Sequence, residues 1–127
     1  MGQAVKSVPP SYVIPTKSGG SPNPDTVVPA ANTAAVLTYA ADTLGRRWTV
    51  GSIHYSYSAA PTGGRLTIQD GTGNVIFDRD IPATGPGDIL FPFPRAGSVN
   101  TDLIITLAAG SGAVVGKLNA TVWLDTA

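Results

Sequence analysis

Residues 65–78 read Arg-Leu-Thr-Ile-Gln-Asp-Gly-Thr-Gly-Asn-Val-Ile-Phe-Asp, and this run is the strongest indication of the fold class. Segments rich in β-branched and aromatic side chains flank the connection Asp-Gly-Thr-Gly at 70–73. Glycine adopts a positive φ without strain, so such a connection favours a tight hairpin. We therefore expect two antiparallel strands, over residues 65–69 and 74–78.

Segments of the same kind recur on both sides of this hairpin at intervals of about 8–12 residues, which is typical of an antiparallel sandwich or barrel. Glycine, proline, asparagine and aspartate separate them, and residues 81–87 are too rich in proline and glycine to be anything but a loop. The further expected strands are 34–41, 48–58, 88–93, 102–108 and 116–124. The pattern predicts an all-β protein, an antiparallel β-sandwich of about seven strands, jelly-roll or immunoglobulin-like.

Two local features refine this prediction. In the segment 48–58 the alternation changes phase at Gly51, with Trp48 and Val50 on one parity and Ile53 on the other. An extra residue in one strand produces such a change, so we expect a β-bulge at Gly51. The connection Ala-Gly-Ser-Gly at 109–112 predicts that the last two strands form a hairpin.

Residues 1–33 differ in composition from the rest and hold six of the eleven prolines. Proline fixes φ and lacks an N–H, so this stretch can form neither a helix nor a central strand. We expect an extended N-terminal arm over 1–33 and one sandwich domain over 34–127, which deletion of residues 2–30 would leave folded. A disordered tail is the alternative. The apolar side chains that we expect to bind a partner or a neighbouring copy are Tyr12, Val13, Ile14, Val27 and Val28.

The charge content excludes several function classes. The 127-residue chain has 8 basic and 8 acidic residues, and only 13% of its residues are charged, about half of the usual share of roughly 25%. Neutralising nucleic-acid phosphates needs a basic face, so nucleic-acid binding is not expected. No apolar run reaches the roughly 18 residues of a membrane span, and residues 1–20 lack the layout of a signal peptide. A chain so poor in charge is expected to bury part of its surface by association.

No catalytic or metal-binding constellation emerges from the sequence. His54 is the single histidine, so a catalytic triad or a histidine metal site would depend on it alone, and ordinary surface pairing is favoured. The segment 70–74 is similar to an oxygen-rich calcium loop, but its twelfth position is Ile81 where a bidentate glutamate is needed. We expect no metal, no cofactor and no enzymatic activity. A small hydrolase is the least favoured alternative.

The aromatic side chains leave a choice between two functions. Trp48, Tyr55, Tyr57 and Trp123 stand at strand spacing, which favours core and cross-strand packing. Exposed and coplanar rings would instead form a platform on which sugars stack. The alternative function is therefore a carbohydrate-binding or receptor-binding module of a fibre or a similar assembly.

A resemblance to a known family rests on segments from the middle of the chain onward. They are 64–71 (Gly-Arg-Leu-Thr-Ile-Gln-Asp-Gly), 75–78 (Val-Ile-Phe-Asp), 85–87 (Gly-Pro-Gly), 91–94 (Phe-Pro-Phe-Pro), 103–110 (Leu-Ile-Ile-Thr-Leu-Ala-Ala-Gly) and 115–119 (Val-Gly-Lys-Leu-Asn). In these segments, about half of the chain, the sequence resembles small virion proteins of tailed bacteriophages, of the capsid decoration or head auxiliary type.

The resemblance implies a structural role. Such proteins are usually β-sandwiches on the outer surface of the capsid, although similar sandwiches occur in fibres. It implies binding to the major capsid protein as symmetric copies such as trimers, and a place in the host cytoplasm during assembly. The stretch 1–33 is also similar to the extended arms with which capsid accessory proteins hold their neighbours.

Overall fold

The computed structural model describes residues 23–126, which form eight β-strands and no helix. The strands are β1 (Asn23–Val27), β2 (Ala35–Tyr39), β3 (Arg46–Tyr57), β4 (Arg65–Asp70), β5 (Val75–Asp80), β6 (Gly87–Ala96), β7 (Leu103–Leu107) and β8 (Gly116–Thr126). The described part of the chain therefore has no helix that could cross a membrane.

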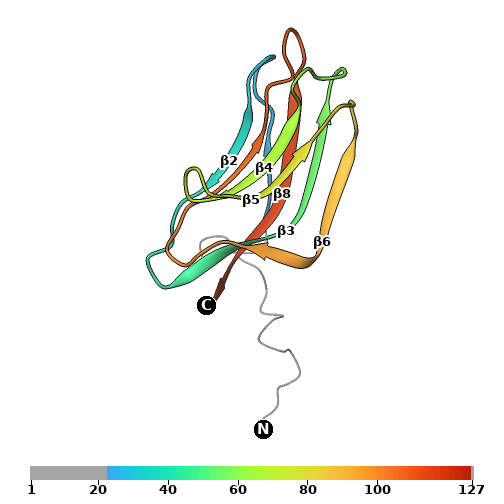
Figure 1. Cartoon of the computed structure of the whole chain (residues 1–127). Helices are drawn as coiled ribbons and strands as arrows, with labels where there is room; N and C mark the ends of the chain where they lie inside the picture. Colours follow the sequence, from blue (N-terminus) through green and yellow to red (C-terminus); the bar gives the residue numbers. More distant parts are fainter. Residues whose placement is uncertain (1–22, 127) are drawn as a thin grey trace.

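The strands form two antiparallel four-stranded sheets, with the orders β1-β8-β3-β6 and β2-β7-β4-β5. Figure 1 shows them as two layers, with β2, β4 and β5 in one and β8, β3 and β6 in the other. β1 pairs with β8, β2 with β7, β3 with β6, and β4 with β5. This is a long hairpin, with the β4–β5 turn at its tip, wrapped into two sheets: a jelly roll. The predicted antiparallel β-sandwich is confirmed.

The strand order also decides between the two predicted topologies. In an immunoglobulin-like sandwich the first two strands lie in the same sheet. Here β1 and β2 lie in different sheets, and β4 and β5 are the one consecutive pair among the described strands that share a sheet as neighbours. The immunoglobulin-like alternative is therefore wrong.

The β4–β5 hairpin forms where the sequence predicts it. Gly71 and Gly73 have φ angles of 77° and 86°, a left-handed conformation that glycine adopts at little cost. The N–H of Asp70 donates to the carbonyl oxygen of Asn74 at 2.8 Å and closes the turn. Glycine at these two positions is thus what allows the chain to reverse within four residues.

The last two strands do not form the predicted hairpin. β7 lies in one sheet and β8 in the other, so the connection after Leu107 crosses between the sheets. The alternation of apolar residues cannot reveal this, because Ile105 of β7 and Leu118 of β8 are both fully buried in the same core from opposite sides. Two strands that face each other across a core have the same apolar pattern as two strands paired edge to edge.

The bulge predicted at Gly51 is confirmed, since the register shifts between Val50 and Ser52 in both pairings of β3. The shift changes the parity of the strand, so that Val50 and Ile53 both point into the core with no exposed surface. A Cβ on Gly51 would lie 2.6 Å from Cζ3 of Trp123. The ring of Trp123 therefore occupies the space that any other residue at position 51 would need.

The predicted boundary of the arm at residue 33 does not coincide with the edge of the sandwich. Asn23–Val27 is strand β1, whose five residues pair with positions 118–122 of β8. β1 is an outer strand, where the missing N–H of Pro24 is tolerated. Deleting residues 2–30 would remove this strand, so we expect such a deletion to disrupt the sandwich instead of leaving it folded. Residues 1–22 of the predicted arm lie outside the described residues.

Candidate functional site

Two features at opposite edges of the sandwich distinguish its surface, and the first is β6. This strand is the outer member of its sheet and runs to Ala96, beyond the predicted end at 93. It pairs with β3 over residues 87–90 and 95–96, and residues 91–94 between them have no register partner in β3. Pro92 and Pro94 lie in this unpaired part, where an absent N–H costs nothing, which is why they do not end the strand.

The unpaired part of β6 and the residue before it carry exposed apolar side chains. Phe93 is 89% exposed and Leu90 is 70% exposed. Phe91 is held against the sandwich, because its ring meets that of Phe77 edge to face at 5.3 Å and the guanidinium of Arg95 lies 5.8 Å from its centroid. We call residues 90–94 the β6 ridge. Its base is fixed by packing, and Phe93 projects from it.

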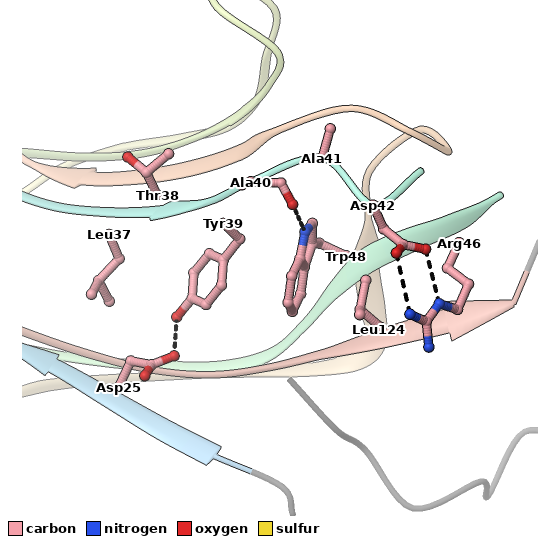
Figure 2. A pocket seen from close by; sticks show the side chains of 10 residues that line it. All are labelled: Asp25, Leu37, Thr38, Tyr39, Ala40, Ala41, Asp42, Arg46, Trp48 and Leu124. Atoms are coloured by element: carbon pink, nitrogen blue, oxygen red, sulfur yellow. Dashed lines mark hydrogen bonds and ion pairs between the residues drawn. The ribbon is translucent and has the colours of Figure 1, made fainter. Parts of the chain in front are cut away.

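The second feature is a pocket of about 480 Å³ at the other edge of the sandwich, shown in Figure 2. Its apolar walls come from both sheets and are formed by Leu37, Tyr39, Trp48 and Leu124. Asp25, Asp42 and Arg46 add two carboxylates and one guanidinium to its lining. We call it the edge pocket. It combines an apolar interior with charged groups in its lining.

The walls of the edge pocket are held in place by hydrogen bonds. The hydroxyl of Tyr39 donates to Oδ2 of Asp25 at 2.7 Å, and Nε1–H of Trp48 donates to the carbonyl oxygen of Ala40 at 2.8 Å (Figure 2). The rings of Tyr39 and Trp48 are 5.0 Å apart and tilted by 47°. Both polar groups of the aromatic walls are thus satisfied internally, and the rings keep their apolar faces for the pocket.

An ion pair between Arg46 and Asp42 stabilises the remaining side of the pocket. The guanidinium of Arg46 donates to both carboxylate oxygens of Asp42, at 2.8 and 3.2 Å. These hydrogen bonds hold the pKa of Asp42 below its usual value. The carboxylate of Asp42 therefore stays ionised in the neutral range, and the pair anchors the turn between β2 and β3.

Replacing Tyr39 by phenylalanine tests how this pocket is held. Burial, followed by the hydrogen bond to Asp25 and its negative charge, raises the pKa of Tyr39 far above 10.0. Tyrosine in the unfolded chain still ionises near 10.0, so proton release favours unfolding, and wild-type stability falls as the pH rises above that value. We expect Tyr39→Phe to cost about 1–2 kcal/mol at pH 7 through the lost hydrogen bond.

The same substitution should make the fall in stability above pH 10 shallower than in the wild type. Urea unfolding at a series of pH values measures both effects. Equal slopes for wild type and variant above pH 10 would show that Tyr39 does not resist ionisation in the folded state.

The residues predicted to bind a partner through the arm are only partly placed by the structure. Tyr12, Val13 and Ile14 lie outside the described residues. Val27 is half-buried in β1 and packs against the core of the sandwich, and Val28, directly after the strand, is 52% exposed. The side chain of Val27 therefore already packs within its own domain. The binding role of all five side chains stays a prediction.

The four aromatic residues predicted as a possible sugar platform do not form one. Trp48 and Tyr57 are 5% and 4% exposed, and the hydroxyl of Tyr57 donates to the carbonyl oxygen of Ala108 at 2.7 Å. Both pack in the core, because the bulge in β3 lets even-numbered residues before it and odd-numbered residues after it point inward. For Trp48 and Tyr57 the low exposure disfavours sugar stacking, and the stacking role stays a prediction. Tyr55 and Trp123 are half-buried, and for them it stays a prediction.

Other residues that the sequence singled out have structural partners. Nδ1 of His54 lies 2.6 Å from Oδ1 of Asp88 in a cross-strand pair on the surface, as expected. The carboxylate of Asp70 accepts hydrogen bonds from the N–H and the hydroxyl of Ser98, so it secures a loop. Within residues 23–126, no three or more acidic, histidine or cysteine side chains gather in a way that could hold a metal ion.

Sequence reasoning missed the edge pocket and the exposure of the β6 ridge. The pocket depends on Leu37 of one sheet and Leu124 of the other lining the same space, which only the strand order reveals. The ridge had a local signal, because residues 91–94 alternate phenylalanine with proline. Proline tolerated within a strand marks an edge, and apolar residues at an edge are exposed unless something covers them.

Comparisons with known proteins add little to this description. No protein-family model matches the chain, and no curated protein matches it. Among solved structures, the chain is similar to a chain of the virus-like particle of extra small virus from the giant freshwater prawn Macrobrachium rosenbergii. The alignment covers 100% of this chain and 96% of that chain at 14% identity, with a TM-score of 0.28. A TM-score this low does not indicate a shared fold, so function must be argued from the residues of the chain itself.

Proposed function

We propose that this protein is a structural protein of a virion that acts by binding, without catalysis. The observation that carries the proposal is the β6 ridge: a jelly roll with few charges exposes Leu90 and Phe93 on an edge strand. Large exposed apolar side chains gathered in one place mark an interaction surface. Jelly rolls build viral capsid domains as well as lectins and cupins, so the fold supports the proposal by analogy only.

The finer proposal follows the resemblance of residues 64–124 to decoration proteins of tailed bacteriophages. The chain would lie on the outer surface of a capsid as symmetric copies, with trimers favoured, and would bind the major capsid protein. During assembly it would be in the host cytoplasm. The arm would contribute Tyr12, Val13, Ile14, Val27 and Val28 to this binding.

The proposed mechanism is burial of apolar surface between subunits. A buried phenylalanine removes roughly 150–250 Å² from water, at about 25 cal/mol for each Å² of apolar surface. Contacts made only in the assembled state stabilise the shell by mass action, since they favour that state over free subunits. A binding function of this kind needs exposed apolar groups on a rigid base, which the packing of Phe91 against Phe77 supplies.

Light scattering of the purified full-length chain over a hundredfold range of concentration tests the proposal, with electron microscopy of the same samples. We expect a discrete assembly of fixed copy number, trimeric or larger, that dissociates on dilution. A monomer at every concentration would contradict the proposal. Specific glycan binding that is lost in Trp123→Ala would favour the carbohydrate-binding alternative instead.

A further inference from the structure

We propose that copies of this chain join through the side of the sandwich that carries the β6 ridge: Phe93 of one copy inserts into a groove between β5 and β6 of the next copy. This inference rests on the proposed function, because it specifies how the subunits of the assembly join. It names the anchor, the groove that receives it and the occupant of that groove, which is a second copy of the same chain.

The groove lies between the outer strands of the two sheets. β5 is the outer member of one sheet and β6 of the other, and residues of both strands line a space of about 460 Å³ between them. Its apolar part consists of Phe77 from β5 and of Ile89 and Phe91 from β6, and the two phenylalanine rings meet edge to face. We call this space the β5–β6 groove. It offers aromatic rings, held in place by their mutual contact, to an incoming side chain.

Phe93 lies beside this groove without filling it. Its second neighbours on either side, Phe91 and Arg95, both line the groove, yet Phe93 itself is 89% exposed. Leu90, which also belongs to the lining, is 70% exposed. Aromatic side chains that enter an apolar recess are typical anchors of protein interfaces. Insertion of Phe93 from a second copy would remove the exposed ring and the apolar part of the groove from water in one contact.

Anchor and groove share one side of the molecule, and this position restricts the symmetry of the assembly. Figure 1 draws β6 as the outer strand on the side away from β2. When identical copies meet through the same side, that side of every copy faces a common rotation axis. Such an assembly closes after a few copies instead of growing into a filament. The closed trimer of the proposed function satisfies this condition.

The charged groups around the groove fit the same contact. Within residues 23–126, Arg95 has no ion-pair partner, and its guanidinium lies near the ring of Phe91. Oδ1 of Asp88 lies 2.6 Å from Nδ1 of His54, whereas Oδ2 of Asp88 has no hydrogen-bond partner in that part of the chain and the side chain is 67% exposed. A carboxylate accepts hydrogen bonds through both oxygens. When Phe93 enters the groove of a neighbour, Arg95 approaches the neighbour's lining, where Asp88 offers this oxygen, and the pair favours this orientation.

Two other occupants fit these observations less well. Pro92 and Pro94 have no N–H to donate, so the ridge is a poor template for a strand added by a neighbour. The N-terminal arm joins the sandwich at β1, which lies at the opposite end of the strand order from β6. An arm segment such as residues 12–14 in the groove would also leave Phe93 without a recess of its own. A second copy covers the anchor and the groove together, and the experiment below includes the arm as an outcome.

Two single variants test the anchor and the groove separately. Phe93→Ala removes the anchor, and Leu90→Asp places a carboxylate in the groove lining. We expect each to weaken self-association by at least about 30-fold, as for the loss of an interface hot spot. Leu44→Asp is the matched control, because Leu44 is 75% exposed and lies between β2 and β3, outside the groove lining. Its self-association should equal that of the wild type. Circular dichroism and thermal unfolding establish that each variant is folded.

A charge reversal tests the orientation of the contact. Arg95→Asp brings two carboxylates together, and Asp88→Arg brings two guanidinium groups together, so we expect each to weaken self-association about 10-fold. The double variant carries opposite charges at every contact, with the two signs exchanged, and should regain most of the lost affinity. Analytical ultracentrifugation over a range of concentrations measures self-association of all variants.

Three results would overturn the inference. The first is self-association of Phe93→Ala equal to that of the wild type, which leaves the proposed function intact because the chain still assembles. If deletion of residues 2–21 then abolishes self-association, the contact belongs to the arm. The second is an equal loss in Leu44→Asp and Leu90→Asp, which would show that the groove has no special part in the contact. The third is a double variant that associates no better than Arg95→Asp alone, because the proposed orientation requires rescue. A wild-type chain that never assembles removes the proposed function itself.

Discussion

Deletion of residues 2–30 is expected to abolish cooperative folding of the sandwich, whereas deletion of residues 2–21 is expected to preserve it. The longer deletion removes β1, which pairs with residues 118–122 of β8, and it removes the carboxylate of Asp25 that accepts the hydroxyl of Tyr39. It also removes Val27, which packs against the core.

The expected size of this effect comes from adding these losses. Each backbone hydrogen bond contributes about 0.5–1.5 kcal/mol net, and burying an aliphatic side chain contributes about 1.5–3 kcal/mol. Together they amount to roughly 5 kcal/mol, which is comparable to the whole stability of a small domain, about 5–15 kcal/mol. Losing an outer strand also leaves the backbone of β8 as an open edge, which promotes aggregation.

Urea unfolding followed by circular dichroism measures both truncations. The shorter deletion is the control, since it removes the same proline-rich stretch without touching β1. A cooperative transition of the 2–30 deletion at the wild-type midpoint would show that β1 contributes nothing to the sandwich. The comparison also matters for function, because an arm can be tested for partner binding only in a truncation that remains folded.

The sequence predicts most individual strands because each depends on neighbouring residues. The β4–β5 hairpin follows from glycine at positions 71 and 73, and the bulge follows from the change of phase at Gly51. Such features are local, so alternation and turn residues suffice to place them. The antiparallel sandwich itself follows from the number and spacing of these strands.

What the sequence could not predict depends on distant residues. β1 falls within the predicted arm because Pro24 and Pro29 flank a short apolar segment, and only its pairing with β8 makes that segment a strand. The strand order was equally hidden, because a residue such as Leu118 is apolar whether its neighbour lies beside it or across the core. The edge pocket could not be predicted for the same reason, because it is assembled from four strands that are far apart in sequence.

The second large effect on stability is expected from β7, which carries two adjacent isoleucines, Ile104 and Ile105. Ile105 has no exposed surface and pairs with Leu37 and Ile68 on the neighbouring strands. Replacing a fully buried isoleucine by alanine loses its transfer free energy and leaves a cavity, which together cost about 2–5 kcal/mol. We expect Ile105→Ala to lower the free energy of unfolding by about 3–4 kcal/mol, within that range.

Ile104 supplies the matched control because it is half-buried on the opposite face of the same strand. Ile104→Ala removes the same atoms and the same preference for β-structure, so the difference between the two variants isolates burial in the core. We expect it to cost about 1 kcal/mol or less, since it leaves no closed cavity. Urea midpoints at an unchanged m-value give both free energies. Equal losses would mean that β7 does not turn Ile105 toward the second sheet, and the assignment of β7 and β8 to facing sheets, on which the edge pocket depends, would fall with it.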